Sequence, residues 1–207
     1  LSADLELTAN VDGNDLAAAL RAEPEGDGLR VPTLSLTAGE NTLSGDLAIA
    51  DLTRATQTLT GSLTIAAPDL SEFSALALTE LAGRLSGQID LTQEAGRATA
   101  HVQLTGTEIS AAGTQVAGLD ADLTLRDLFT APALAGKARA TGILTGGTPV
   151  EQVDITASGT GDNTEFSLDA RLAKGADADG VALAGTLATG NDGLDLLLKT
   201  LDGRYRG

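Results

Sequence analysis

The chain contains no cysteine, methionine or tryptophan, and aromatic residues make up only 2% of its 207 residues. Without cysteine it forms neither disulfide bonds nor thiolate metal sites, and this composition is compatible with an oxidising compartment. Aromatic side chains dominate the energetics of compact cores and of protein interfaces. The apolar surface of this chain is therefore almost wholly aliphatic, closer to hydrocarbon than to a protein-binding surface. The four aromatic residues are Phe73, Phe129, Phe166 and Tyr205.

Basic residues are also few. The chain has 13 lysines and arginines against 29 acidic residues, which gives a formal net charge of −16. A nucleic-acid-binding protein needs basic residues to neutralise phosphates, and this balance argues against that class. It also argues against docking flat on an anionic membrane leaflet, which requires clustered lysine and arginine.

Long apolar runs are absent as well. No stretch of about 18 apolar residues could cross a bilayer as a helix, and no signal peptide is recognisable. The sequence starts at Leu1, already inside an alternating pattern, and no shift of composition marks a domain boundary. We therefore expect residues 1–207 to be one structural unit, an interior segment of a longer polypeptide whose anchor or targeting segment lies elsewhere.

What the chain does contain is a repeated alternation of apolar and polar residues. The segments Leu43–Ile49, Leu59–Ile65 and Leu85–Leu91 each alternate an aliphatic residue or glycine with a polar one. A period of two is that of a β-strand, whose successive side chains point to opposite faces. The alternation returns more loosely at 119–125 and 183–187, and glycine, asparagine and aspartate separate the segments as tight turns require. The sequence predicts an antiparallel all-β meander.

Three segments depart from this alternation. Over Pro68–Leu76, the spacing of apolar residues predicts a short helix near 69–77, with Asp69 and Glu72 as a capping box. Asn14–Glu23 fits either a helix or a strand, and we favour the strand. Asp127–Gly136 is expected to be an irregular connection.

Candidate catalytic residues are scarce. His101, the only histidine, falls on the polar side of its strand beside Thr99 and Gln103. Because no nucleophile or orienting acid is recognisable near it, we interpret it as a surface residue. No nucleophile elbow, phosphate-binding loop or dinucleotide fingerprint is present. With one histidine and no cysteine, a zinc site is nearly excluded.

Calcium is the more serious alternative, because Asp177–Gly180 and Gly190–Asp195 resemble pieces of calcium-binding loops. An EF-hand loop counted from Gly175 would need an acidic ligand at its twelfth position, where Thr186 stands. Hairpin turns explain the same aspartates and glycines. We therefore predict no enzymatic activity, no cofactor and no metal.

An amphipathic sheet must bury its apolar face, and two architectures remain open. The sheet either closes on itself as a β-sandwich or barrel, or stays an elongated, curved sheet with an open hydrophobic groove. Small residues recur on the apolar rows, and glycine within strands often marks curvature or a close approach. We interpret them as shallow space for a groove, and so favour the open form. These residues are Gly45, Gly61, Gly87, Ala100, Ala121 and Gly185.

The order of segments resembles the periplasmic β-repeat region of the TamB family, within the AsmA-like group of bridge-like lipid transfer proteins. The motif Leu-x-Gly-x-Leu-x-Ile stands at 43–49 and 59–65, and the segments 68–87, 118–123 and 127–136 continue the likeness. The likeness is clearest from Leu43 to Leu172. Two family features are not recognisable, namely the N-terminal membrane anchor and the C-terminal segment that engages an outer-membrane barrel.

The resemblance implies a twisted β-groove with an aliphatic lining in the periplasm of a Gram-negative bacterium, in a full-length protein anchored in the inner membrane. It further implies phospholipid acyl chains as partners, and a TamA-type barrel partner bound through regions outside this chain. Our first hypothesis is a non-enzymatic lipid-conducting groove that bridges the two membranes. Its expected lining residues are Leu43, Leu47, Ile49, Leu59, Leu63, Ile65, Leu85, Ile89, Leu91, Val102, Leu104, Leu123 and Leu125.

Two alternatives stay open. A chaperone-like surface would pair its exposed sheet edge with strands of outer-membrane barrel or autotransporter proteins during their assembly or secretion. An extracellular structural β-domain would instead have a closed, dry core.

Overall fold

A computed structural model describes residues 2–11, 14–54, 58–129, 132–160, 163–173, 178–190 and 193–205. Within these residues the protein is an all-β structure with one antiparallel sheet and very little helix. The strands are β1 (Ala3–Val11), β2 (Asn14–Glu25), β3 (Gly28–Ala38), β4 (Asn41–Ile49), β5 (Leu59–Ala67), β6 (Leu81–Glu94), β7 (Arg97–Ala111), β8 (Thr114–Arg126), β9 (Ala133–Thr145), β10 (Thr148–Thr160), β11 (Asn163–Leu172), β12 (Ala178–Gly190) and β13 (Gly193–Tyr205).

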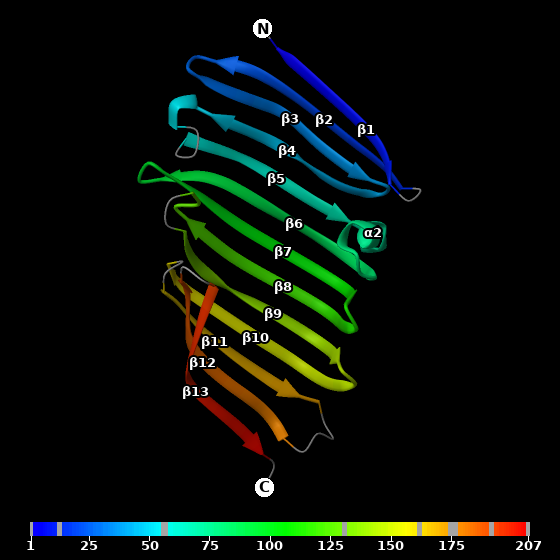
Figure 1. Ribbon diagram of the computed structural model, residues 1–207, viewed down its shortest axis with the longest axis vertical. Coiled ribbons are helices and arrows are strands. Elements are labelled where there is room, and N and C mark those ends of the chain that lie inside the picture. Colours follow the sequence, from blue (N-terminus) through cyan, green and yellow to red (C-terminus); the bar gives the residue numbers. More distant parts are fainter. Residues whose placement is uncertain are drawn as a thin grey trace.

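The strands lie in the sheet in the order in which they occur in the sequence, from β1 at one edge to β13 at the other. Every strand pairs antiparallel with its sequence neighbours, so the whole structure is one meander that does not close into a barrel. Figure 1 shows the strands stacked along the long axis of the molecule, with the two termini at opposite ends. The predicted open, elongated sheet is confirmed, and the segment Asn14–Glu23 is indeed a strand, within β2.

The sheet is a single layer. Its accessible surface is 12405 Å², whereas a compact monomer of 20.8 kDa exposes about 9,000 Å². All the described strands belong to one sheet, and the extensive contacts of each are with its neighbours in that sheet. Only five apolar side chains are fully buried among the described residues, so no conventional core is present.

A line of unpaired residues crosses β6 to β10 and bends the sheet. One residue in each of these strands has no partner in the pairing register. We call this line the crease, and it consists of Gly83, Glu108, Ala117, Gly142 and Glu151. The register shifts at the two ends of this line, between β6 and β7 and between β10 and β11, and shifts of this kind bend a strand and increase its twist. The backbone φ is positive at three of them: 105° at Gly83, 53° at Glu108 and 58° at Gly142.

The direction of the bend follows from β7. A Cβ built on Gly106 would lie 2.4 Å from Cδ1 of Ile109. In a straight strand the Cα atoms of residues three apart are about 10 Å apart, too far for this contact. The strand therefore bends towards the face to which Ile109 points. Gly106 pairs with Leu85 and Leu119, so this is the aliphatic face of the sheet.

The predicted helix near 69–77 is present as a 3-10 turn, η2 (Leu70–Phe73), followed by one turn of α-helix, α2 (Ser74–Ala77). Asp69 is its N-cap and accepts a hydrogen bond from the backbone N–H of Ser71. The expected capping box is wrong in its second half. The Glu72 carboxylate accepts from Nδ2 of Asn41 and from the N–H of Glu40, so it ties the helix to the β3–β4 turn instead.

Asn41 completes this attachment. Its Nδ2 also donates to the carbonyl of Asp69 at 2.7 Å, and its Oδ1 accepts from the N–H of Asp69 at 3.1 Å. The Asn41 side chain is fully buried, as are the neighbouring Ala38 and Ala67. In Figure 1 the helix lies at the ends of β5 and β6, where it covers one end of the sheet.

Two further short segments connect strands. A 3-10 turn, η1 (Leu52–Arg54), follows β4. The connection between β8 and β9 is shorter than expected, because β9 already begins at Ala133. The prediction of an irregular segment up to Gly136 is therefore wrong for its last four residues. The run Ala133–Gly136 pairs with β8 and β10, and this pairing on both sides outweighs its weak alternation.

Candidate functional site: the aliphatic face of the sheet

The register of the sheet assembles rows of apolar residues that cross all thirteen strands. Residues directly opposite each other in neighbouring strands point to the same face. One such row reads Leu5, Leu20, Leu34, Gly45, Leu63, Ile89, Val102, Leu123, Gly136, Ala157, Phe166, Gly185 and Leu198. A parallel row runs from Leu7 to Leu201 and is equally apolar; it lies two residues away along each of β1 to β12 and three residues away along β13, where the register shifts. We call the face that carries these rows the aliphatic face.

All thirteen residues that the sequence predicts as groove lining belong to the aliphatic face. The register aligns Leu43 with Ile65, Leu63 with Ile89, and Val102 with Leu123. The remaining predicted residues are Leu47, Ile49, Leu59, Leu85, Leu91, Leu104 and Leu125, and they follow the same alternation in β4 to β8. Each of the thirteen side chains is half-buried: neither freely exposed nor sealed in a core.

This half-burial arises within the single layer. Each aliphatic side chain is flanked by neighbours in the adjacent strands and by the residues two positions away in its own strand. Exposure rises at the two edges, where one flank is missing. Leu7 on β1 is 58% exposed and Leu201 on β13 is 63% exposed. The helix η2–α2 lies over one end of this face, where Asn41 binds Asp69 and Glu72 and where Ala38 and Ala67 are buried.

Further aliphatic residues extend this face across the crease, and sequence reasoning missed them. Ile109, Val116, Ile143 and Val150 form a row across β7 to β10, which ends at Leu172. All five side chains are half-buried. The crease shifts the alternation by one residue, which returns them to the aliphatic face. The sequence does contain a signal for this shift. Two residues of the aliphatic face stand three positions apart instead of two, as Gly106 and Ile109 do in β7.

The glycines of the aliphatic face do not provide space, and this expectation is wrong. A Cβ on Gly45 would lie 2.0 Å from the carbonyl oxygen of Ser62, and one on Gly61 would lie 2.1 Å from that of Asp46. Both obstacles are backbone atoms of the neighbouring strand. Gly61 also has a φ of 145°, which residues with a side chain rarely adopt. These glycines are needed because the backbones of β4 and β5 approach closely.

Gly185 meets the same kind of obstacle and an aromatic ring as well. A Cβ there would lie 2.4 Å from the carbonyl oxygen of Leu197 on β13 and 3.1 Å from the ring of Phe166, its register partner on β11. Phe166 therefore occupies the space above this glycine, which is itself buried.

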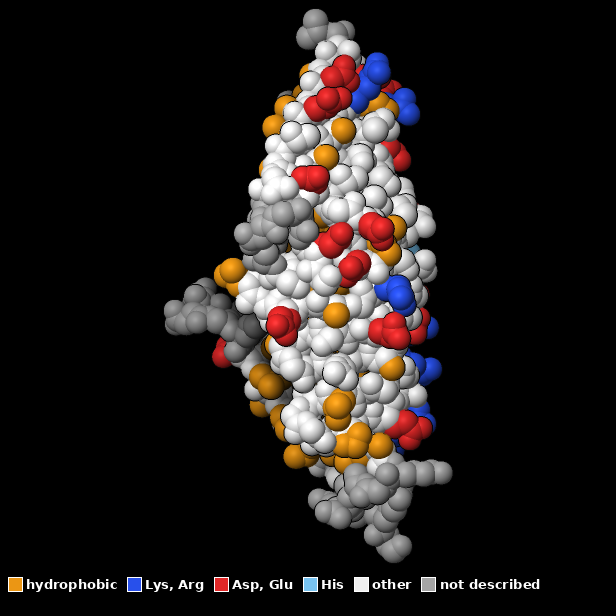
Figure 2. All heavy atoms as spheres, turned by 90° about the vertical axis from the view of Figure 1, so that its right-hand side faces the viewer, with side chains coloured by type: hydrophobic (Ala, Val, Ile, Leu, Met, Phe, Trp, Pro, Cys, Tyr) orange, Lys and Arg blue, Asp and Glu red, His pale blue; other side chains and the backbone are white. Residues whose placement is uncertain are grey.

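The opposite face carries the charges. Figure 2 shows Lys and Arg side chains gathered along one margin of the molecule, away from the margin where hydrophobic side chains gather. The predicted position of His101 on this polar face is confirmed. Its Nε2 lies 3.6 Å from a carboxylate oxygen of Asp122, and its Nδ1 lies 3.3 Å from the Thr124 hydroxyl. The geometry is that of a half-exposed strand residue between acidic neighbours.

Hydrogen bonds on the polar face favour ionised carboxylates. The amide of Gln88, and then the hydroxyl of Ser62, lower the pKa of Asp90 below its ordinary value. Arg139 donates to Asp154 at 2.6 Å and lowers the pKa of that carboxyl in the same way. These contacts are cross-strand or next-residue-but-one pairs, which stabilise a solvated sheet surface.

A hollow of about 890 Å³ lies on the polar face. In each of β7 to β10, polar residues two positions apart line it. In β7 these are Gln103 and Thr105, which flank Leu104. A hollow on the aliphatic face would instead be lined by the aliphatic residues that alternate with them, such as Val102 and Leu104. The floor of the observed hollow also includes part of the second aliphatic row, and Leu104 is the one predicted groove residue in it; the residues of that row are Gly87, Leu104, Ala121, Ala138 and Ile155.

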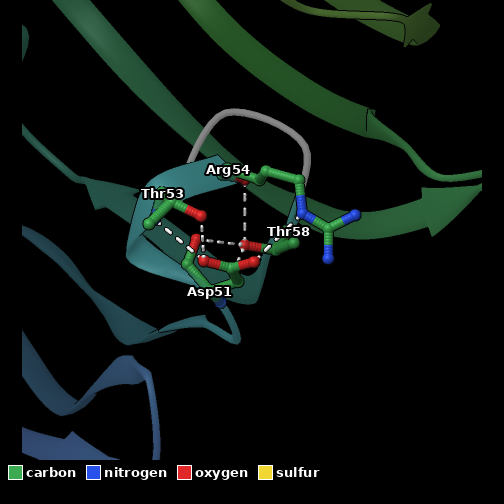
Figure 3. Close-up of polar contacts among 4 residues, drawn as sticks. All are labelled: Asp51, Thr53, Arg54 and Thr58. Atoms are coloured by element: carbon green, nitrogen blue, oxygen red, sulfur yellow. Dashed lines mark hydrogen bonds and ion pairs between the residues drawn. The ribbon is translucent and has the colours of Figure 1, made fainter.

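At one end of β4 and β5, the residues Asp51, Thr53, Arg54 and Thr58 form a compact polar network (Figure 3). The Asp51 carboxylate accepts from the Thr53 hydroxyl at 2.6 Å, from the Thr53 N–H at 2.9 Å and from Nε of Arg54 at 3.0 Å. The hydroxyl of Thr58 donates to the carbonyls of Asp51 and Arg54. Hydrogen bonds from Thr53 and then from Arg54 lower the pKa of Asp51 to about 2.

No family model, curated protein or solved structure matches the chain. Among the described residues, no helix has the length and apolarity to span a membrane, and no group of three or more acidic or histidine side chains could hold a metal ion. Of the two calcium-like segments, Asp177, Asn191 and Asp192 lie outside the described residues.

Proposed function

We propose that this chain is a non-enzymatic, lipid-conducting segment of a TamB-like protein that bridges the inner and outer membranes. In this role it would carry phospholipid through the periplasm during outer-membrane biogenesis. One observation carries the proposal: an aliphatic face that crosses thirteen strands and that no second sheet of the described structure covers. A protein whose purpose was only structural would bury such a face against another layer.

The energetics of an acyl chain support this function. Burial of one methylene from water contributes about 0.8 kcal/mol. When an acyl chain moves from a bilayer onto an aliphatic protein face, its methylenes stay in an apolar environment. The free energy of the chain therefore changes little. Leucine, isoleucine, valine and alanine side chains therefore provide a surface along which a lipid moves without a deep well or a high barrier.

The length of the face also supports a conducting role. Twelve intervals between thirteen strands, at about 4.8 Å each, give a path of about 58 Å. The two fully apolar rows continue over all of this length without a charged residue. An acyl chain on this face would therefore pass from one edge of the described sheet to the other without leaving an apolar environment.

Site-specific photo-crosslinking in the full-length protein tests the function. A photoreactive amino acid at Leu63 or Leu85, on the aliphatic face, is expected to form phospholipid adducts. The same amino acid at Thr64 or Ser86, one residue further along the same strands but on the polar face, is the matched control and is expected to form few adducts. Absence of adducts at Leu63 and Leu85, or equal yields on both faces, would refute the groove.

The edge strand β13 favours a second candidate, a surface that pairs with strands of outer-membrane barrel proteins in transit. Leu196 and Leu198 lie on its aliphatic face and Leu197 on its other face, so this edge exposes leucine on both sides. An exposed edge strand is a template for β-strand addition. Photo-crosslinks from Leu197 to unfolded barrel proteins, without lipid adducts at Leu63, would favour this candidate over the groove.

A further inference from the structure

The hollow on the polar face has two walls of polar side chains. Each wall is a row of register partners, whose side chains stand beside one another on the same face. One wall consists of Gln88, Gln103, Asp122, Lys137 and Thr156, and the other of Thr105, Asp120, Arg139 and Asp154. The volume of about 890 Å³ lies within the range of about 300–1,000 Å³ that small-molecule sites occupy.

Charged side chains face each other across this hollow at two neighbouring strands. In β8, Asp120 stands on one wall and Asp122 on the other, and we call these the acidic pair. In β9, Arg139 and Lys137 stand on the same two walls, and we call these the basic pair. Neighbouring strands lie about 4.8 Å apart, so the two pairs are separated by about one strand spacing.

The two pairs do not simply neutralise each other. In the register, Asp120 is opposite Arg139. Asp122 is likewise opposite Lys137. Arg139 forms its ion pair with Asp154 instead, at 2.6 Å. Within the described part of the chain, Asp120 and Lys137 form neither a hydrogen bond nor an ion pair. A carboxylate on one wall and an ammonium group on the other are thus available to a ligand.

All four charged groups are accessible. Asp120 and Lys137 are exposed. The side chain of Arg139 is 58% exposed, and its guanidinium keeps free N–H groups beside the ion pair, because it carries five. The side chain of Asp122 is 44% exposed, although one of its oxygens lies 3.6 Å from Nε2 of His101. A ligand in the hollow can therefore contact both walls at once.

The floor between the two pairs offers few hydrogen-bonding groups. It is formed by the backbone of Ala121 and Ala138, which are register partners in β8 and β9 and whose side chains belong to the aliphatic face. Both strands lie in the interior of the sheet, where backbone N–H and C=O groups bond to the neighbouring strands on either side. Methylene groups of a ligand can therefore lie on this floor without leaving a polar group unsatisfied.

From this arrangement we infer that the hollow binds a small zwitterion, with its ammonium group over the acidic pair and its carboxylate over the basic pair. The ligand class is an amino acid or short peptide whose two charged groups are separated by a short chain. Each charged group of the ligand meets two groups of opposite charge, one from each wall. The site lies on the face opposite the aliphatic rows, and it does not depend on the proposed function.

Charge complementarity favours a zwitterion over an ion of either sign. A simple cation at the acidic pair would lie about 4.8 Å from the basic pair, and a simple anion at the basic pair would lie equally close to the acidic pair. An anion is also repelled at long range by the net charge of −16. A zwitterion avoids these penalties, because each of its charges lies over the pair of opposite sign.

NMR titration of the isotope-labelled protein tests this inference. The probes are 4-aminobutyrate, which is zwitterionic, and its single-charge analogues butyrate and butylamine. We expect 4-aminobutyrate to shift the backbone amide signals of Ala121 and Ala138 saturably. Each analogue is expected to bind about two- to twentyfold more weakly, because it lacks the contacts to one of the two exposed charged pairs.

Two variants assign the orientation of the ligand. Lys137→Gln is expected to weaken the binding of 4-aminobutyrate and of butyrate about two- to fivefold, and not to weaken that of butylamine. Asp120→Asn is expected to weaken the binding of 4-aminobutyrate and of butylamine to a similar extent, and not to weaken that of butyrate. A general loss of structure would not separate the two analogues in this way.

Lys199→Gln is the matched control. Lys199 is also a solvent-accessible lysine of the polar face, but it pairs with Glu165 at 3.1 Å and lies outside the hollow. This substitution removes the same charge from the protein as Lys137→Gln does. It is expected to leave the affinity for all three probes unchanged.

The outcomes are decisive for the site. Equal affinity for the three probes, or no saturable shift at Ala121 and Ala138, would overturn it. Equal weakening by Lys137→Gln and Lys199→Gln would also overturn it, because the effect would then arise from net charge alone. None of these outcomes bears on the aliphatic face, which the photo-crosslinking at Leu63 tests separately. Circular dichroism of each variant establishes that the sheet is folded in every comparison.

Discussion

The two faces of this sheet are built from the same thirteen strands, yet they differ in almost every property. The aliphatic face carries rows of leucine, isoleucine, valine, alanine and glycine, and its central side chains are half-buried without a covering layer. The polar face carries serine, threonine and the charged residues, tied by cross-strand hydrogen bonds. The difference shows that the strands depend mainly on their lateral neighbours in one sheet, while one face of that sheet is apolar and the other polar.

The largest expected effect comes from a charge placed on the aliphatic face. Leu63 lies between Gly45 and Ile89, and its neighbour Thr64 lies between Ser44 and Gln88 on the other face. Leu63→Asp is expected to lower the free energy of unfolding by about 2–4 kcal/mol, because it removes apolar contacts and places a carboxylate among aliphatic side chains. Urea denaturation followed by circular dichroism measures this change.

Thr64→Asp is the matched control, since Thr64 is exposed among polar neighbours. Surface changes of this kind cost within about 0.5 kcal/mol. Equal destabilisation by Leu63→Asp and Thr64→Asp would mean that the two faces are energetically alike, against the comparison drawn above.

A smaller effect is expected when a methyl group is added to a glycine of each face. Gly45→Ala on the aliphatic face would place a Cβ 2.0 Å from a backbone carbonyl of β5, and the strands must separate. We expect a loss of about 1–3 kcal/mol in the free energy of unfolding. In Gly118→Ala on the polar face, the obstacle is the hydroxyl of Thr141 at 2.8 Å, which rotates away.

Thermal unfolding of Gly45→Ala and Gly118→Ala compares the two sites directly. Gly118→Ala is expected to be close to neutral. If Gly45→Ala were as stable as the wild type, the close approach of β4 and β5 would not be required, and the glycine would be available to widen a groove.

The smallest effect concerns pH and the strand ends. The pKa of Asp51 is lowered from 3.8 to about 2 by Thr53 and Arg54. Because the pKa is lower in the folded state, this carboxylate stabilises the fold above pH 3.8, and the contribution is lost as the pH falls towards 2. Asp51→Asn is expected to unfold at a lower temperature than the wild type at pH 6, with the difference shrinking towards pH 2. An unchanged difference at pH 2 would contradict this role.

Much of the fold followed from local patterns. Alternation with period two, together with turn residues between the segments, predicted the antiparallel meander, and the spacing of Leu70 and Phe73 predicted the short helix. The same alternation placed all thirteen candidate lining residues on one face. These features are local, because the face to which a side chain points in a regular strand depends only on its position in that strand.

The features that failed are those that depend on contacts between distant residues. The partner of Glu72 is Asn41, which lies 31 residues earlier, and no capping rule predicts it. The glycines of β4 and β5 were interpreted as free space, because a sequence does not show how closely two backbones approach. The crease depends on residues in five strands that come into line only when the sheet has formed.

The sequence by itself determined the class of the fold, the division into an aliphatic and a polar face and the acidic character of the surface, because each depends on composition or on alternation within a strand. Only the tertiary structure decided that the strands form one open sheet and that this sheet bends towards its aliphatic face. The physical reason is that these properties depend on the register between strands and on the twist that accumulates across them.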